Sequence, residues 1–139
     1  MKILCMSHGE MAGGVVQSAK LIVGDVDYLE HINAYVDENN DVDKLIDEYL
    51  RKNKGETIIV VTDIFGGSVN NSWLKRLNSV KNLYLVSGMS LQLIIQLVLS
   101  IDSQNNADVK KTIKDALALT KQGFKFCNEI DLNSGTDEF

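Results

Sequence analysis

Proline is absent from the 139 residues, so the usual marker of loops and helix ends is missing. Cysteine is scarce: Cys5 and Cys127 are the only two, and they form neither a CxxC pair nor a disulfide framework. Both stand in apolar segments, which predicts buried thiols in a reducing compartment. No apolar run approaches the roughly 20 residues of a membrane span, and the one after Met1 is too short for a signal peptide. We therefore expect a cytoplasmic protein.

Positive charge is also in short supply. The chain has 14 lysines and arginines against 19 aspartates and glutamates, and its formal net charge is -5. Such a surface is poorly suited to neutralise nucleic-acid phosphates or anionic lipid, so neither is an expected partner. The sequence lacks the GxxxxGK[ST] and GxGxxG motifs that bind nucleotides. His31 is the only histidine besides His8, and the acidic run 37–41 lacks the pattern of a calcium loop. We expect no cofactor and no metal.

The composition is that of an ordinary globular domain, with 45% hydrophobic and 24% charged residues. A chain of this length can bury roughly two thirds of its unfolded surface in one core. It shows no internal repeat, low-complexity stretch or linker. We expect one domain over residues 1–128 and a frayed C-terminal tail over 129–139.

Short apolar runs alternate with segments of helical periodicity along the chain. Strands are expected over 2–7, 28–35, 57–62 and 83–87, with a short fifth strand over 123–127. Helices are expected over 12–23, 42–50, 69–77, 91–101 and 109–117. The strand over 57–62 is β-branched almost throughout, which is typical of a central parallel strand. The alternation predicts an α/β fold with an open, doubly wound, mainly parallel sheet covered by helices on both faces.

Ligand sites in such sheets lie beyond the carboxyl ends of the strands, near the point where strand order reverses. This rule selects the loops 7–10, 63–68 and 87–90. His8 stands in the first loop, directly before a glycine and a helix start, where backbone N–H groups favour anions. Because the ordinary pKa of histidine is close to neutrality, a neutral and nucleophilic imidazole is available. On position alone, a histidine that merely caps the helix is an equally good interpretation.

The second loop, DIFGGS over 63–68, adds the groups that a phosphohistidine site needs. An ionised Asp63 could accept a hydrogen bond from one nitrogen of His8 and leave the lone pair of the other to attack phosphorus. Gly66 and Gly67 allow close approach of backbone N–H groups, and Ser68 can donate to a phosphoryl oxygen. A tight turn capped by Asp63 and Ser68 would need no chemistry. Taken with His8, however, the loop favours phosphoryl transfer.

These two loops resemble the motifs of a known family. The chain from Lys2 to about Phe126 resembles the enzyme IIA domains of the mannose family of the bacterial phosphoenolpyruvate-dependent sugar phosphotransferase system. The resemblance is carried by the apolar strand that runs into Ser-His-Gly at 7–9 and by TDIFGGS at 62–68. It implies a phosphotransferase whose histidine, matching His8, accepts a phosphoryl group from the phosphocarrier protein HPr. The group then passes to a cognate enzyme IIB during sugar uptake, so the membrane is involved only through the permease.

The resemblance also implies roles for other parts of the chain. The residue matching Asp63 orients the imidazole, and the one matching Ser68 lies beside the phosphoryl group. A homodimer is implied, in which a C-terminal strand, here 123–127, adds to the partner's sheet. Around His8 we expect an apolar partner face, with Met11, Phe65 and Met89 as candidate contacts.

Two positions depart from the family pattern. Val69 stands where members commonly have proline, and the loop over 88–92 reads GMSLQ where asparagine and proline are frequent. Partner and permease specificity therefore do not carry over. Two alternatives stay open: a regulatory or binding module of the same fold, and the subunit that serves dihydroxyacetone kinase. That second branch typically lacks the GGS-type turn, so the loop at 63–68 favours the sugar branch.

Overall fold

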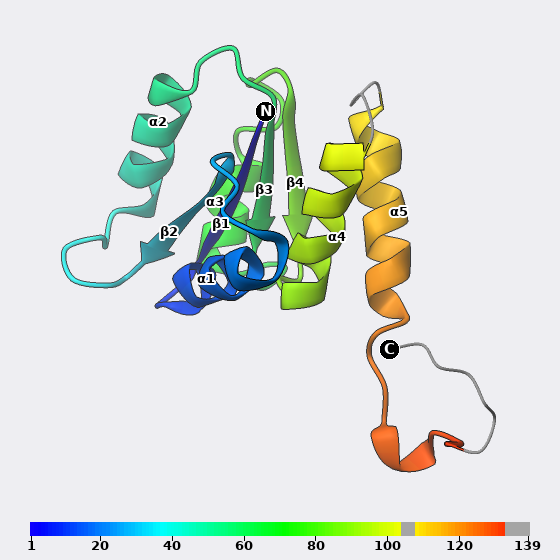
Figure 1. Ribbon diagram of the computed structural model, residues 1–139. Coiled ribbons are helices and arrows are strands. Elements are labelled where there is room, and N and C mark those ends of the chain that lie inside the picture. The colour runs from blue at the N-terminus through cyan, green and yellow to red at the C-terminus, as the bar shows by residue number, and fades with distance from the viewer. Residues whose placement is uncertain (104–107, 133–139) are drawn as a thin grey trace.

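The computed structural model describes residues 1–103 and 108–132 of the chain (Figure 1). Its strands are Lys2–His8 (β1), Leu29–Ala34 (β2), Ile58–Thr62 (β3) and Leu83–Ser87 (β4). Its helices are Met11–Val23 (α1), Val42–Lys52 (α2), Ser68–Leu74 (α3), Leu91–Ser103 (α4) and Val109–Lys121 (α5), followed by a 3₁₀ turn, Cys127–Glu129 (η1). Strands and helices alternate from β1 to α4, as the apolar periodicity predicts.

The four strands form one parallel sheet in the order β2-β1-β3-β4. The register pairs His8 with Ala34 across β1 and β2, and Met6 with Thr62 across β1 and β3. All four carboxyl ends therefore meet at one edge of the sheet. The chain leaves β1 toward β2 on one side and returns to β3 on the other, so the order reverses between β1 and β3. The prediction of a doubly wound α/β fold is confirmed.

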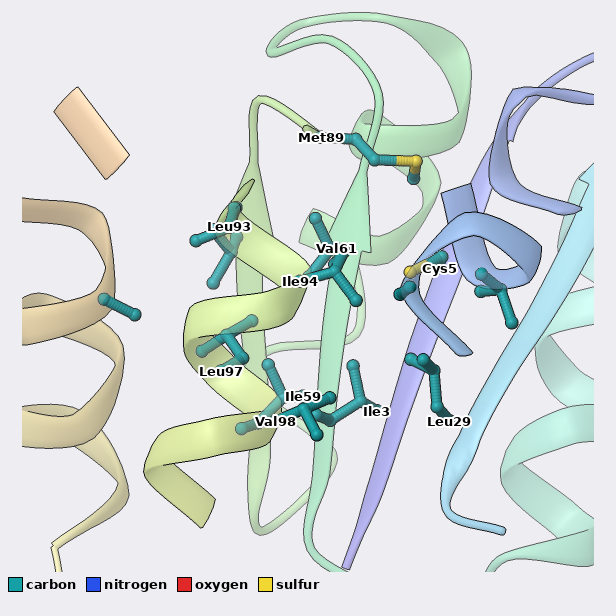
Figure 2. Close-up of a cluster of buried hydrophobic side chains, with 14 of the residues drawn as sticks. Ile3, Cys5, Leu29, Ile59, Val61, Met89, Leu93, Ile94, Leu97 and Val98 are labelled. Carbon is teal, nitrogen blue, oxygen red and sulfur yellow. The ribbon is translucent and has the colours of Figure 1, made fainter. Parts of the chain in front are cut away.

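Successive side chains of the central strands enter two separate cores, because side chains alternate between the faces of a strand. One core contains Ile3, Cys5, Ile59 and Val61 and is covered by α1 and α4, with α5 packed on α4. Figure 2 shows Leu93, Ile94, Leu97 and Val98 of α4 beside Ile59 and Val61 of β3. β3 is buried along its whole length, which its β-branched sequence predicts.

The opposite core lies under α2 and α3. Trp73 of α3 is fully buried there, and its indole Nε1 donates to Sδ of Met6 at 3.3 Å. Arg76, just after α3, links this helix to α2. Its guanidinium donates to Asp43 at 3.0 Å and to Asp47 at 2.9 Å, both on α2. The two helices that precede and follow β3 are thereby joined on one face of the sheet.

Two predictions about the C-terminal part are wrong for the single chain. Residues 123–127 form no strand: after α5 the segment leads away from the sheet, and none of the strands in the described part of the chain pairs with it (Figure 1). Phe124 and Phe126 are exposed as a result. Cys127 is exposed rather than buried, whereas Cys5 is buried and its burial raises the pKa of the thiol to about 12.

The remaining boundaries differ little. α3 ends at Leu74 instead of reaching Leu77, because the chain continues in tight turns such as Leu77 N to Leu74 O at 3.3 Å. The division at residue 128 stays a prediction, and residues 133–139 of the predicted tail lie outside the described part of the chain. In the described parts, no helix is both long and apolar enough to cross a membrane.

Candidate functional site

His8 and Asp63 meet at the carboxyl edge of the sheet, at the point where strand order reverses. His8 is the last residue of β1 and Asp63 follows β3, and these two strands pair in parallel. Oδ2 of Asp63 accepts hydrogen bonds from the backbone N–H of His8 at 2.9 Å and from its ring Nδ1 at 2.8 Å. The strand register therefore positions the imidazole from both its backbone and its ring.

The electrostatics of the pair favour an ionised Asp63. Partial burial raises the pKa of this carboxyl, but the hydrogen bonds from the backbone and ring of His8 outweigh it, and the pKa lies below its ordinary value. A carboxylate can only accept hydrogen bonds, so Nδ1 of His8 carries a proton. In the neutral imidazole, Nε2 then has a free lone pair. The ring is accessible, since 44% of the His8 side chain is exposed.

Ser68 lies at the other ring nitrogen, Nε2. It is the first residue of α3, and its Oγ is 3.2 Å from Nε2 of His8. The intervening turn is made possible by two glycines. Gly66 has φ +81°, a left-handed conformation that side chains rarely adopt, and a Cβ on Gly67 would stand 2.8 Å from Cγ2 of Ile64. Glycine therefore suits both positions: it adopts the φ of Gly66 without strain, and at Gly67 it avoids the contact with Ile64 and leaves room beside Cε1 of His8.

Two asparagines of α3 hold this turn in place. Oδ1 of Asn70 accepts from Gly66 N at 3.2 Å, and Nδ2 of Asn71 donates to Gly66 O at 3.0 Å. Asn70 is buried and also donates to Oγ1 of Thr62, the last residue of β3, at 3.0 Å. The sequence analysis did not identify these residues, although paired asparagines in a helix are a signal, because their side chains compete for backbone groups.

The predicted roles of Gly66 and Gly67 as phosphoryl donors stay untested. Gly66 N donates to Asn70, and Gly67 N donates to Ile64 O at 3.3 Å, so both groups are engaged within the turn. Either would have to leave its partner to reach a phosphoryl oxygen. The side chain of Ser68 is the donor that already faces the imidazole.

Tyr35, which the sequence analysis missed, completes the surroundings of His8. It follows β2, whose last residue, Ala34, pairs with His8. Its ring stacks on the imidazole with centroids 5.3 Å apart and planes 28° from parallel. Its hydroxyl lies 2.7 Å from Oγ of Ser68. The rule of strand ends applies to β2 as well, and it would have indicated this position.

The alternative in which His8 only caps α1 is not supported. Ser7 is fully buried, and its Oγ accepts from Ala12 N in the first turn of α1 at 2.7 Å. The capping group is therefore Ser7, which leaves the ring of His8 to Asp63 and Ser68.

The candidate partner contacts separate into two groups. Met11 and Phe65 are exposed, Phe65 to 75% of its surface, and so is Ile64 beside it. Met89 is only 6% exposed and packs in the core, as Figure 2 shows. Its loop folds back onto β3, since Gly88 N and Met89 N both donate to Thr62 O at 3.1 Å. Met89 is therefore a core residue, and its prediction as a partner contact is wrong.

The arrangement combines an unprotonated ring nitrogen, Nε2, a carboxylate at the other ring nitrogen and a hydroxyl beside Nε2. Such a set can accept a group at Nε2 and stabilise the charge that develops on the ring. Among the residues that the structure describes, no three His, Cys, Asp or Glu side chains gather as a metal site would require.

A family model and several solved structures match the chain. The family model described as "PTS system fructose IIA component" (EIIA-man) matches residues 2–114. No curated protein matches the chain. A structure from Klebsiella pneumoniae subsp. pneumoniae, described as a phosphoenolpyruvate-dependent sugar phosphotransferase system (PTS) permease, is similar with TM-score 0.84 and 34% identity. The match covers 92% of this chain and 91% of that one.

Two further structures share the fold. Phosphotransferase system component EIIA from Streptococcus agalactiae has TM-score 0.77 and 25% identity, covering 93% of this chain and 98% of that chain. The mannose/sorbose specific IIA subunit from Enterococcus faecalis also has TM-score 0.77, at 21% identity, covering 97% and 98%.

Proposed function

The chain belongs to the EIIA-man family of sugar phosphotransferase system IIA components, and on this basis we propose that it carries a phosphoryl group on Nε2 of His8. The donor is phospho-HPr and the acceptor is a cognate enzyme IIB. The observation that carries the proposal is the contact of Nδ1 with Asp63 at 2.8 Å, because it makes Nε2 the unprotonated nitrogen of the neutral ring.

In the charging step, the lone pair of Nε2 attacks the phosphorus of the phosphohistidine on HPr. The Nε2–P bond forms as the donor's P–N bond breaks, and the electron pair of that bond stays on the donor nitrogen. The Nδ1 proton remains in place, so the ring of His8 becomes positively charged, and the carboxylate of Asp63 stabilises it at 2.8 Å. In the second step, a histidine or cysteine nucleophile of enzyme IIB takes the phosphoryl group and the pair returns to Nε2. Positioning and electrostatics supply the catalysis.

The test is phosphorylation from radiolabelled phosphoenolpyruvate with enzyme I and HPr. We expect an acid-labile, alkali-stable label on the wild-type chain and none on His8→Ala. The chain provides a matched control, because His31 is its only other histidine and lies on β2. His31→Ala should label like wild type.

Failure of wild type to label, while a IIA component of known activity labels in the same mixture, would overturn the proposal. Label retained in His8→Ala and lost in His31→Ala would overturn the assignment to His8. Transfer onward is measured by adding purified mannose-family enzyme IIB and following loss of label from the IIA component.

We also propose a homodimer in which residues 123–127 of each copy add to the sheet of the other. Two features support it: Phe124 and Phe126 are exposed on a segment that leads away from the body (Figure 1), and β4 is an edge strand. Pairing the segment with β4 of the second copy would cover the two phenylalanines and the open edge of β4.

Light scattering should give twice the chain mass for wild type and the chain mass for a variant that ends at residue 122. A wild-type monomer at micromolar concentration would contradict the dimer.

A further inference from the structure

We propose that Tyr35 is a positioning residue for phosphoryl transfer, which directs the hydroxyl of Ser68 toward the nitrogen that accepts the phosphoryl group. The inference rests on the proposed function of His8. Tyr35 directly follows β2 and takes no part in the contact between His8 and Asp63.

The geometry links three side chains in series. The hydroxyl of Tyr35 is 2.7 Å from Oγ of Ser68, and that Oγ is 3.2 Å from Nε2 of His8. The tyrosine ring also stacks on the imidazole at a centroid distance of 5.3 Å. Tyr35 therefore touches the nucleophile with its ring and reaches the nucleophile's hydrogen-bond partner with its hydroxyl.

The direction of each hydrogen bond follows from Asp63. Because Nδ1 carries the proton that Asp63 accepts, Nε2 of the neutral ring can only accept a hydrogen bond. Ser68 must then donate its single hydroxyl hydrogen to Nε2. Its Oγ can consequently act toward Tyr35 only as an acceptor, so the tyrosine hydroxyl donates. The chain of donors runs from Tyr35 through Ser68 to His8.

The backbone of Tyr35 is held in a conformation that a bulky residue rarely adopts. Its φ is +64°, in the left-handed region, and its N–H donates to Asn39 O at 2.7 Å. The preceding residue, Ala34, is fixed on the other side, since its carbonyl accepts from Gly9 N at 2.8 Å. Unfavourable backbone conformations that are retained in this way concentrate at functional sites. Here the conformation places the ring over His8.

During transfer the lone pair of Nε2 forms the bond to phosphorus and no longer accepts the hydroxyl hydrogen of Ser68. This hydrogen can then turn to an oxygen of the phosphoryl group. Tyr35 still donates to Oγ of Ser68 and keeps the serine side chain in place. The cost of ordering Ser68 is met before the reaction, which is how preorganised donors accelerate a transfer. Without the tyrosine hydroxyl, Ser68 is free to rotate toward solvent.

The test is a double-mutant cycle on the rate of phosphorylation by phospho-HPr. We expect Tyr35→Phe to lower kcat about three- to tenfold, the effect of one ordinary hydrogen bond, with KM for phospho-HPr unchanged. Since the tyrosine hydroxyl acts through Ser68, Tyr35→Phe should have no further effect in a Ser68→Ala chain. Matched controls are Tyr28→Phe and Tyr49→Phe, which remove hydroxyls bonded to Asp102 and Glu30, respectively, and should leave kcat unchanged.

A second readout does not depend on phosphorylation. The ¹⁵N shifts of the His8 ring should report the Nδ1–H form in both wild type and Tyr35→Phe, with the Nε2 shift moving in Tyr35→Phe as its hydrogen bond from Ser68 weakens. An unchanged kcat in Tyr35→Phe, or an equal decrease in the Ser68→Ala background, overturns the inference while leaving the role of His8 intact. If wild type does not label at all, the proposed function fails. Whether or not wild type labels, an Nε2 shift that does not respond to Tyr35→Phe overturns the hydrogen-bond chain.

Discussion

Nδ1 of His8 lies 2.8 Å from Oδ2 of Asp63, although 55 positions separate the two residues in the chain. The contact exists because β1 and β3 are parallel neighbours whose ends reach the same edge of the sheet. Asp63 also accepts the backbone N–H of His8, so it fixes both the ring and the strand end that carries it. The tautomer of His8 is therefore determined by the residue that follows β3.

Replacing Asp63 by asparagine should slow phosphorylation on the order of 100-fold or more, because a neutral amide cannot stabilise the positive charge that develops on the His8 ring as the carboxylate does. The rate is measured with phospho-HPr as donor. Asp115→Asn, which alters only an exposed pair with Lys111 on α5, is the matched control and should react like wild type. An Asp63→Asn chain of normal rate would refute the orienting role.

Stability should depend on pH through the same carboxyl. The pKa of Asp63 is lowered in the folded chain, so its contribution is present above the unfolded pKa of about 3.9 and is lost as pH falls through the folded pKa. The difference in free energy of unfolding between wild type and Asp63→Asn should therefore shrink as pH falls from about 5 to about 2. Urea titrations across this range measure it. A difference that does not vary with pH contradicts the lowered pKa.

Ser7→Ala should destabilise the chain by about 1 kcal/mol, because it leaves the Ala12 N–H at the start of α1 without its buried acceptor. Ser79→Ala removes the hydroxyl of an exposed serine and serves as the control, with a change within about 0.5 kcal/mol. Both are obtained from denaturant unfolding followed by circular dichroism. Equal effects of the two substitutions would show that the Ser7 hydrogen bond does not stabilise α1.

Phe65→Ser should raise KM for phospho-HPr about tenfold and leave kcat nearly unchanged, as expected of an apolar contact that binds the partner but not the phosphoryl group. Phe65 is 75% exposed in the loop that also carries Asp63 and Ser68, so its loss should not affect folding. Leu21→Ser is the control, because Leu21 is 83% exposed on α1. A decrease in kcat at unchanged KM would instead indicate that Phe65 shapes the site itself.

Much of the fold could be predicted because its signals are local. The β-branched run at 57–62 indicates a buried parallel strand without reference to any other segment, and β3 occupies Ile58–Thr62. The meeting of His8 and Asp63 also followed, since strand ends of a parallel sheet share one edge.

The missed features depend on neighbours that a sequence does not show. A strand requires a pairing partner, and residues 123–127 have none in the single chain, so an apolar alternating pattern did not suffice. Met89 lies in a loop, where exposure is the ordinary expectation. The hydrogen bond from its backbone N–H to Thr62 O places its side chain in the core, and the sequence does not reveal that bond. Tyr35 resembles any aromatic residue at the end of a strand, and its role depends on an unusual φ of +64°.

On the proposed function, the pairing of β1 with β3 also sets when a newly made chain can accept a phosphoryl group. His8 leaves the ribosome well before Asp63 has been synthesised, and the contact between them needs a long-range parallel pairing, which forms slowly. Until β3 docks, the imidazole has no fixed tautomer and Ser68 is not beside it. Uptake of a phosphoryl group during translation would therefore count only the chains in which β3 has docked, and its time course would report that docking.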